Sequence, residues 1–117
     1  MTACSIDLIT NTEVSGTTST LIGSARILTG SNTQISFRAM MGPSAATTAS
    51  LEIKRFTGGD SILILSASGM GLQDISGSGI TLPGPDANIH NDWYDFYASG
   101  STAATISLIK GIRVVLS

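Results

Sequence analysis

The 117-residue chain has a formal net charge of −2 at pH 7 and only 12% charged residues, against about 25% in an ordinary soluble domain. Its six basic residues are scattered, which excludes the basic surface of a nucleic-acid-binding protein, and no apolar run approaches the ~20 residues of a membrane span. The single cysteine excludes an internal disulfide, whereas 14 Ile, 10 Leu, 3 Val and 3 Phe suffice for a core, so we expect one domain over residues 1–117.

Alternation of apolar and polar residues predicts strands along most of the chain, and no segment shows the 3.6-residue periodicity of a helix. In chain order, the predicted strands are residues 4–10, 18–28, 34–41, 50–56, 61–66, 92–98 and 104–116. Gly23 predicts a bend or bulge in the second strand, and Arg55 and Phe56 break the alternation of the fourth. Residues 61–66 enclose the run Ile-Leu-Ile-Leu, which predicts a strand buried on both faces.

The strands at 34–41 and 104–116 are expected to supply the core. In the first, one face carries Ile35, Phe37, Ala39 and Met41. In the last, one face carries Ile106, Leu108, Ile112, Val114 and Leu116 and is interrupted by Lys110, while the other carries Ile109 and Val115 beside Ser107 and Arg113. In the strand at 50–56, Leu51 and Ile53 point inward and Glu52 and Lys54 point outward.

About seven to eight strands joined by Gly-, Ser- and Asn-containing turns predict an all-β fold, a single antiparallel β-sandwich or jelly roll with essentially no helix. The connection over residues 67–89 is long and rich in glycine. A loop of that length in a compact domain is functional or held by a neighbour, so we expect contacts with another chain there.

The residues that usually carry catalysis are scarce. There is one His, and neither the Gly-x-Ser-x-Gly elbow of hydrolases nor the phosphate-binding Gly-x-x-x-x-Gly-Lys-Ser/Thr pattern is present. Asp86, Asn88, His90 and Asp92 alternate and would point the same way in an extended segment, as calcium ligands do. The Gly and closing Glu of a calcium loop are missing, however, and turn-forming residues explain the stretch as well. We therefore expect no enzyme, no cofactor and no metal site.

One aromatic cluster offers a candidate binding site, at Trp93, Tyr94 and Tyr97. On a strand, Trp93 and Tyr97 share a face with Asp95, while Tyr94 shares the other face with Phe96. Exposed rings beside Asp and Asn would form a platform for a sugar. The alternative, which we favour, is that Tyr94 and Phe96 belong to the core and that Trp93 and Tyr97 seal the sandwich end or a subunit contact.

The scarcity of charge also bears on association with other chains. Monomeric β-proteins place charged residues, proline or bulges on edge strands to prevent pairing. Few such residues occur on the predicted strands, and several strands have apolar residues on both faces. One interpretation is that Ser and Thr alone keep the surface soluble. The other, which we favour, is that identical subunits or another protein cover part of it.

The first three quarters of the chain are rich in small residues and poor in charge. They are followed by the stretch Asp92-Trp93-Tyr94-Asp95-Phe96-Tyr97, the Gly100-Ser101-Thr102 turn and the strand at 106–116. In this composition and order of segments, the sequence resembles small β-sandwich structural proteins of tailed-bacteriophage virions, namely capsid decoration (cement) proteins and small fibre domains. The resemblance implies a non-enzymatic subunit located in the virion, a homotrimer seated on capsid or tail protein, with no nucleic-acid or membrane partner. Two alternatives are a carbohydrate-binding module or receptor-binding fibre tip, and a bacterial surface or fimbrial subunit.

Overall fold

The computed structural model describes residues 4–28, 34–55, 59, 61–77, 80–81 and 91–116. This part of the chain contains strands and turns and no helix, as expected. The strands are β1 (Cys4–Ser15), β2 (Thr20–Leu28), β3 (Gln34–Pro43), β4 (Thr48–Arg55), β5 (Ser61–Ser68), β6 (Gln73–Ser76), β7 (Ile80–Thr81), β8 (Asn91–Gly100) and β9 (Ile106–Leu116).

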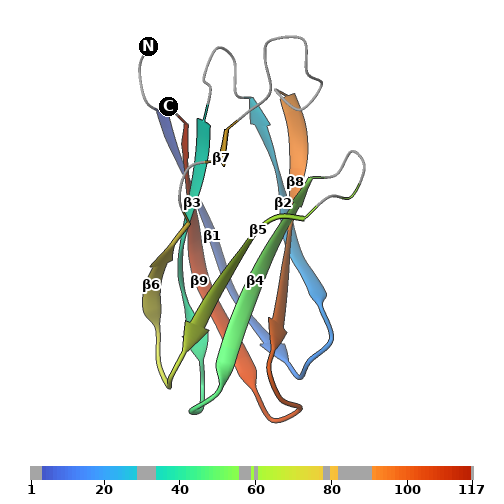
Figure 1. Cartoon of the computed structure of the whole chain (residues 1–117), viewed down its shortest axis with the longest axis vertical. Coiled ribbons are helices and arrows are strands. Elements are labelled where there is room, and N and C mark those ends of the chain that lie inside the picture. Colours follow the sequence, from blue (N-terminus) through green and yellow to red (C-terminus); the bar gives the residue numbers. More distant parts are fainter. Residues whose placement is uncertain are drawn as a thin grey trace.

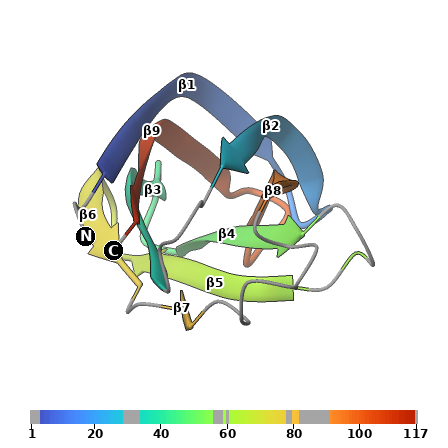
Figure 2. The same ribbon diagram turned by 90° about the horizontal axis from the view of Figure 1, so that it is seen from above.

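The strands form two antiparallel sheets that face each other (Figures 1 and 2). One sheet has the order β1-β9-β3-β6, with β7 also pairing with β3, and the other has the order β2-β8-β4-β5. The pairings are nested along the chain, because β1 pairs with β9, β2 with β8, β3 with β6 and β7, and β4 with β5. This nesting is the jelly-roll arrangement, so the predicted fold class is confirmed.

The core lies between the sheets. It is built from the residues of each strand that point inward, which are about every second residue. Phe37 of β3 contacts β8 across this core, with its ring centroid 6.1 Å from that of Tyr94 and 6.2 Å from that of Phe96. The inward face predicted for β3 is confirmed, as are the inward positions of Leu51 and Ile53 on β4. Fully buried side chains of this core include Ile27, Ile35, Phe37, Met41, Leu51, Ile53, Tyr94, Phe96, Ile109, Ile112, Val114 and Leu116.

The predicted face of β9 is wrong for its first half. Ser107 and Ile109 are buried, whereas Ile106 is exposed and Leu108 only partly buried. The cause is a bulge: Met40 and Met41 of β3 are consecutive, but their partners on β9 are Gly111 and Ile109, which leaves Lys110 as an extra residue. An extra residue shifts the inward set by one position. The bulge predicted near Gly23 is present, because the β2–β8 register shifts between Leu21 and Gly23.

The burial predicted for residues 61–66 is also wrong. The segment is β5, an edge strand of the second sheet, and the side chain of Ile64 is 58% exposed. Leu65 and Ala67 are buried, so only one face of β5 contacts the core. An apolar run does not distinguish a central strand from an edge strand whose outer face remains uncovered.

The predicted connection at 67–89 contains the end of β5, the strands β6 and β7, and residues outside the described part of the chain. Four described turns lie together at the lower end of the sandwich in Figure 1. Backbone hydrogen bonds of 2.9–3.0 Å join them: Gly16 N to Thr105 O, Ser44 N to Ile106 O, Gly71 N to Pro43 O and Ser101 N to Thr48 O. These bonds satisfy backbone groups that would otherwise lack partners and fix that end of the molecule.

Candidate functional site

The aromatic cluster lies on β8, whose alternation divides it between the two faces. Tyr94 and Phe96 are each 1% exposed and belong to the core, as the favoured interpretation predicts. Trp93 is 48% exposed and shares the outer face with Asp95 and the partly buried Tyr97. Burial excludes Tyr94 from direct contact with a ligand in this structure, whereas Trp93 presents an aromatic surface to solvent.

Polar side chains from β2 and β4 contact this face of β8. The Ser24 hydroxyl donates to Asp95 Oδ1 at 2.5 Å. The Lys54 ammonium lies 4.8 Å from the ring centroid of Tyr97 and 3.6 Å from Glu52 Oε1. The cation therefore covers one face of the Tyr97 ring. A sugar stacking on that ring face would have to displace Lys54, so Trp93 is the more accessible platform.

A second candidate surface is the edge of the β2-β8-β4-β5 sheet formed by β5. Its sequence Ser-Ile-Leu-Ile-Leu-Ser-Ala-Ser has neither charge nor proline, and Ile64 projects from its outer face. Its register shifts only at its start, where Ile53 and Lys54 of β4 pair with Leu63 and Ser61. Beyond that shift the strand presents an uncharged edge of regular register, which is a template for another strand.

The other described edges are protected against pairing. Strand β1 carries Asp7 and Glu13 and an irregularity at Asn11, whose φ is 44°. Strand β2 carries Arg26 and the register shift near Gly23. Strand β6 has four residues and β7 has two. Among the described edges, β5 is therefore the least protected, because it has no charged residue and its register shifts only near its start.

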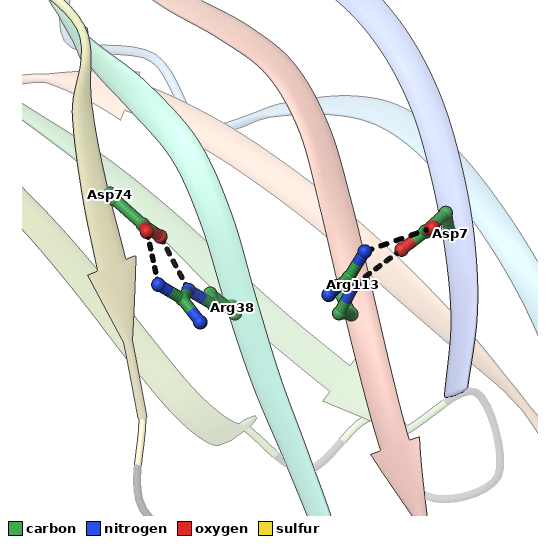
Figure 3. A network of polar contacts seen from close by, with 4 residues as sticks. All are labelled: Asp7, Arg38, Asp74 and Arg113. Carbon is green, nitrogen blue, oxygen red and sulfur yellow. Dashed lines mark hydrogen bonds and ion pairs between the residues drawn. The ribbon is translucent and has the colours of Figure 1, made fainter. Parts of the chain in front are cut away.

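A row of charged residues crosses the outer face of the five-stranded sheet (Figure 3). Arg38 of β3 donates from Nε to Asp74 Oδ1 at 2.7 Å and from Nη2 to Asp74 Oδ2. Arg113 of β9 donates from Nε to Asp7 Oδ1 at 2.7 Å and from Nη2 to Asp7 Oδ2 at 3.2 Å. Both arginines thus bind a carboxylate on a neighbouring strand in two-pronged geometry.

These contacts set the charge states of the row. Hydrogen bonds from Arg113, aided by its charge, hold the pKa of Asp7 below its usual value despite partial desolvation. Arg38 lowers the pKa of Asp74 in the same way, with a further contribution from the charge of Arg113. All four groups are therefore charged near neutral pH.

Sequence reasoning did not identify this row or the β5 edge. The four charged residues are visible in the sequence, but their proximity depends on the pairing of β1, β9, β3 and β6, which local patterns do not reveal.

The candidate calcium stretch at 86–92 lies almost entirely outside the described residues. Within the described part, no group of three or more His, Cys, Asp or Glu side chains is placed to hold a metal ion. That part also has no helix long and apolar enough to cross a membrane.

No protein-family model and no curated protein matches the sequence. Among solved structures, the CBM36-1 domain of a multidomain xylanase from the hindgut metagenome of Trinervitermes trinervoides has 11% identity and a TM-score of 0.62, with 95% of this chain and 96% of that chain covered. The carbohydrate-binding module CBM36 in complex with calcium and xylotriose has 16% identity and a TM-score of 0.59, with coverage of 96% and 87%. The structure of the infectious bursal disease virus Gx strain has 10% identity and a TM-score of 0.63, with coverage of 99% and 32%.

These similarities establish the fold. The chain matches the carbohydrate-binding modules over nearly their whole length but spans only about a third of the viral chain. Sugar-binding modules and virus particles both use this architecture, so the fold alone does not choose between them. The choice must rest on the surfaces of this chain.

Proposed function

We propose that the protein is a non-enzymatic structural subunit of a virion, a capsid decoration protein that binds the shell through the β5 edge. The observation that carries this proposal is the contrast between β5 and the other described edges. Three kinds of protection, namely charge, irregular register and short length, occur on the other edges, and β5 relies on none of them beyond its first residues. An apolar edge left open in this way is suited to a permanent neighbour.

Pairing at β5 would extend the four-stranded sheet by a strand from a partner. The backbone groups of β5 would supply the hydrogen bonds, and the outer side chains would supply specificity. Ile64 would lose its exposure to water. Met70, in the β5–β6 turn, is 74% exposed and is a further apolar side chain that a partner could cover. Burial of such side chains is worth about 1.5–3 kcal/mol each when complete.

The proposed partners are copies of this chain, as a homotrimer, and capsid or tail protein, with the virion as the location. An interface of about 800 Å² per partner is sufficient for stable binding. In a symmetric shell, a trimer would bind several sites at once, which raises the overall affinity without new kinds of contact. The viral particle among the similar structures supports this use of the fold.

The test is co-sedimentation of the chain with shells assembled from the capsid protein of the same virus. Ile64→Lys places a charge on the β5 edge, and Leu21→Lys is the matched control because Leu21 is an exposed apolar residue, at 52%, on the β2 edge. We expect the wild-type chain and Leu21→Lys to sediment with the shells and Ile64→Lys to remain in solution, with unchanged circular dichroism. Failure of the wild-type chain to bind, or equal binding of both variants, would contradict the proposal.

The second candidate function is carbohydrate binding at the outer face of β8, as in a binding module or a fibre tip. Trp93 carries it, because a half-exposed indole can stack on the apolar face of a sugar. A glycan array compares the wild-type chain with Trp93→Ala and with Leu72→Ala, an exposed apolar residue of the β5–β6 turn. Binding that Trp93→Ala abolishes and Leu72→Ala preserves would favour this function. An array without specific binding would contradict carbohydrate binding.

No surface of the described residues specifically favours the third alternative, a fimbrial subunit.

A further inference from the structure

The charged row on the five-stranded sheet places two arginines side by side. Arg38 and Arg113 are directly opposite each other on β3 and β9. Like charges in that position destabilise a sheet. Here each guanidinium binds an aspartate on its far side, so the two arginines lie between the two aspartates (Figure 3). The middle of the row is therefore positive and its ends are negative.

Each arginine retains donors that the aspartates do not use. A guanidinium has five N–H bonds, and the contacts to Asp74 and Asp7 involve only the Nε and Nη2 atoms. Among the described residues, neither Nη1 group is used in a hydrogen bond. A negatively charged group placed between the arginines would be nearer to both guanidiniums than to the two carboxylates, so attraction would exceed repulsion.

A depression of about 480 Å³ lies beside these donors. Gly111 pairs with Met40 on this face, and because Gly111 has no side chain the surface is hollow there. A β-carbon on Gly111 would meet only the carbonyl oxygen of Leu8, at 3.4 Å. The lining combines the four charged residues with the exposed side chain of Met40, whereas Leu8 and Ile112 border the depression but their side chains pack toward the core. A depression of this volume is in the range that takes small organic ligands.

We propose that this depression binds an organic carboxylate, whose two oxygens accept hydrogen bonds from Arg38 and Arg113 while its carbon body lies against Met40. Arginine matches the planar shape of a carboxylate. The flanking Asp7 and Asp74 make the lining neutral overall, so the preference for a carboxylate over phosphate rests on the planar match to arginine and on the contact of the carbon body with Met40. The site is on the other sheet from Trp93 and involves no residue of β5, so it is independent of both proposed functions.

Nuclear magnetic resonance titration with sodium glucuronate and sodium benzoate tests the proposal. Glucose and benzyl alcohol are the neutral analogues, and phosphate at equal ionic strength tests the preference for an organic carboxylate over another anion. We expect saturable shifts of the Gly111 and Arg113 amides with at least one carboxylate and weaker or no shifts with the other three compounds. Binding of glucuronate alone identifies an acidic-sugar site, and binding of benzoate alone identifies an aromatic-acid site; either outcome supports the proposal. Equal shifts with the neutral analogues, or with phosphate, would overturn it, as would the absence of saturable shifts with both carboxylates.

Three variants locate the site. Arg113→Gln should weaken binding by about tenfold or more, because it removes a charge-assisted hydrogen bond. Gly111→Val should block the depression while keeping both arginines. Lys110→Gln is the matched control, because it removes a positive charge from an exposed neighbouring residue that does not line the depression. Unfolding curves identify any variant that fails to fold, and affinities that Arg113→Gln and Gly111→Val leave unchanged would overturn the assignment.

Discussion

The backbone of Gly42 on β3 packs directly against the backbone of Gly71 in the β5–β6 turn. A β-carbon built on Gly42 would lie 1.8 Å from the carbonyl oxygen of Gly71, closer than any real contact. The Gly71 amide also donates to the carbonyl of the adjacent Pro43 at 2.9 Å. Gly42 is therefore required for the turn to reach β3, and this contact holds the ends of β3, β5 and β6 together.

Gly42→Ala should therefore lower the free energy of unfolding by about 1–3 kcal/mol or more, because the turn must move to make room for the methyl group. Gly23→Ala is the control, since a β-carbon there meets nothing within 4 Å and the backbone has no unusual φ. That variant should be unchanged in stability, or more stable by up to about 1 kcal/mol. Chemical denaturation measures both, and equal stability of the two variants would show that the close approach is absent.

Phe37 makes the central contacts of the core. Its ring meets those of Tyr94 and Phe96, and all three side chains are fully buried. Phe37→Ala should lower the free energy of unfolding by about 3–5 kcal/mol through lost burial and the cavity left behind. Ile64→Ala on the exposed face of β5 should change the stability of the isolated chain by no more than about 0.5 kcal/mol. A small loss for Phe37→Ala in denaturant titrations would contradict this description of the core.

Sequence patterns predicted the interior better than the edges. Strict alternation in β3 and β8 identified the inward positions of Phe37, Tyr94 and Phe96, because every second side chain of a regular strand points to the same face of the sheet. The pattern failed at Lys110, where a bulge of one residue exchanges the two faces of β9. It also failed at Ile64, because the burial of an apolar strand depends on what lies beside it. Both failures arise from pairing between distant segments.

The candidate site was predictable to a similar extent. The exposure of Trp93 follows from the alternation of β8 and was expected as one of two interpretations. The row Asp7, Arg113, Arg38 and Asp74 was not expected, because it joins residues up to 106 positions apart. Its formation requires the jelly-roll nesting, which brings the first and last strands together. Charge positions in the sequence carry no information about that pairing.

The two Asp–Arg pairs predict a loss of stability in acid. Hydrogen bonds and charge from Arg113 and Arg38 hold the pKa values of Asp7 and Asp74 below those of the unfolded chain. As the pH falls below about 4, the unfolded chain therefore takes up protons before the folded chain does. The contribution of the pairs is fully present above that range and is lost as the pH falls through the folded pKa values.

Comparison with the double variant Asp7→Asn/Asp74→Asn isolates this effect. Melting temperatures of the wild-type chain should fall more steeply than those of the variant between about pH 4 and pH 2. The difference should be small, because the pairs are exposed, and should shrink in 1 M salt, which screens charges beyond about 3 Å. Parallel curves for the two proteins at low salt would show that the pairs do not contribute.

Because of the bulge at Lys110, we expect deletion of this residue to be better tolerated than deletion of another exposed residue of β9. Removing Lys110 leaves Ser107, Ile109, Ile112, Val114 and Leu116 on one side of a regular strand, which are the residues that the structure buries. Removing Arg113, another exposed cation of β9, instead turns Val114 and Leu116 away from the core. Exposing these two side chains costs about 1.5–3 kcal/mol each. We therefore expect the Lys110 deletion to fold with a cooperative thermal transition and the Arg113 deletion to lose it. If the Lys110 deletion failed to fold while the Arg113 deletion folded, the register assigned to β9 would be wrong.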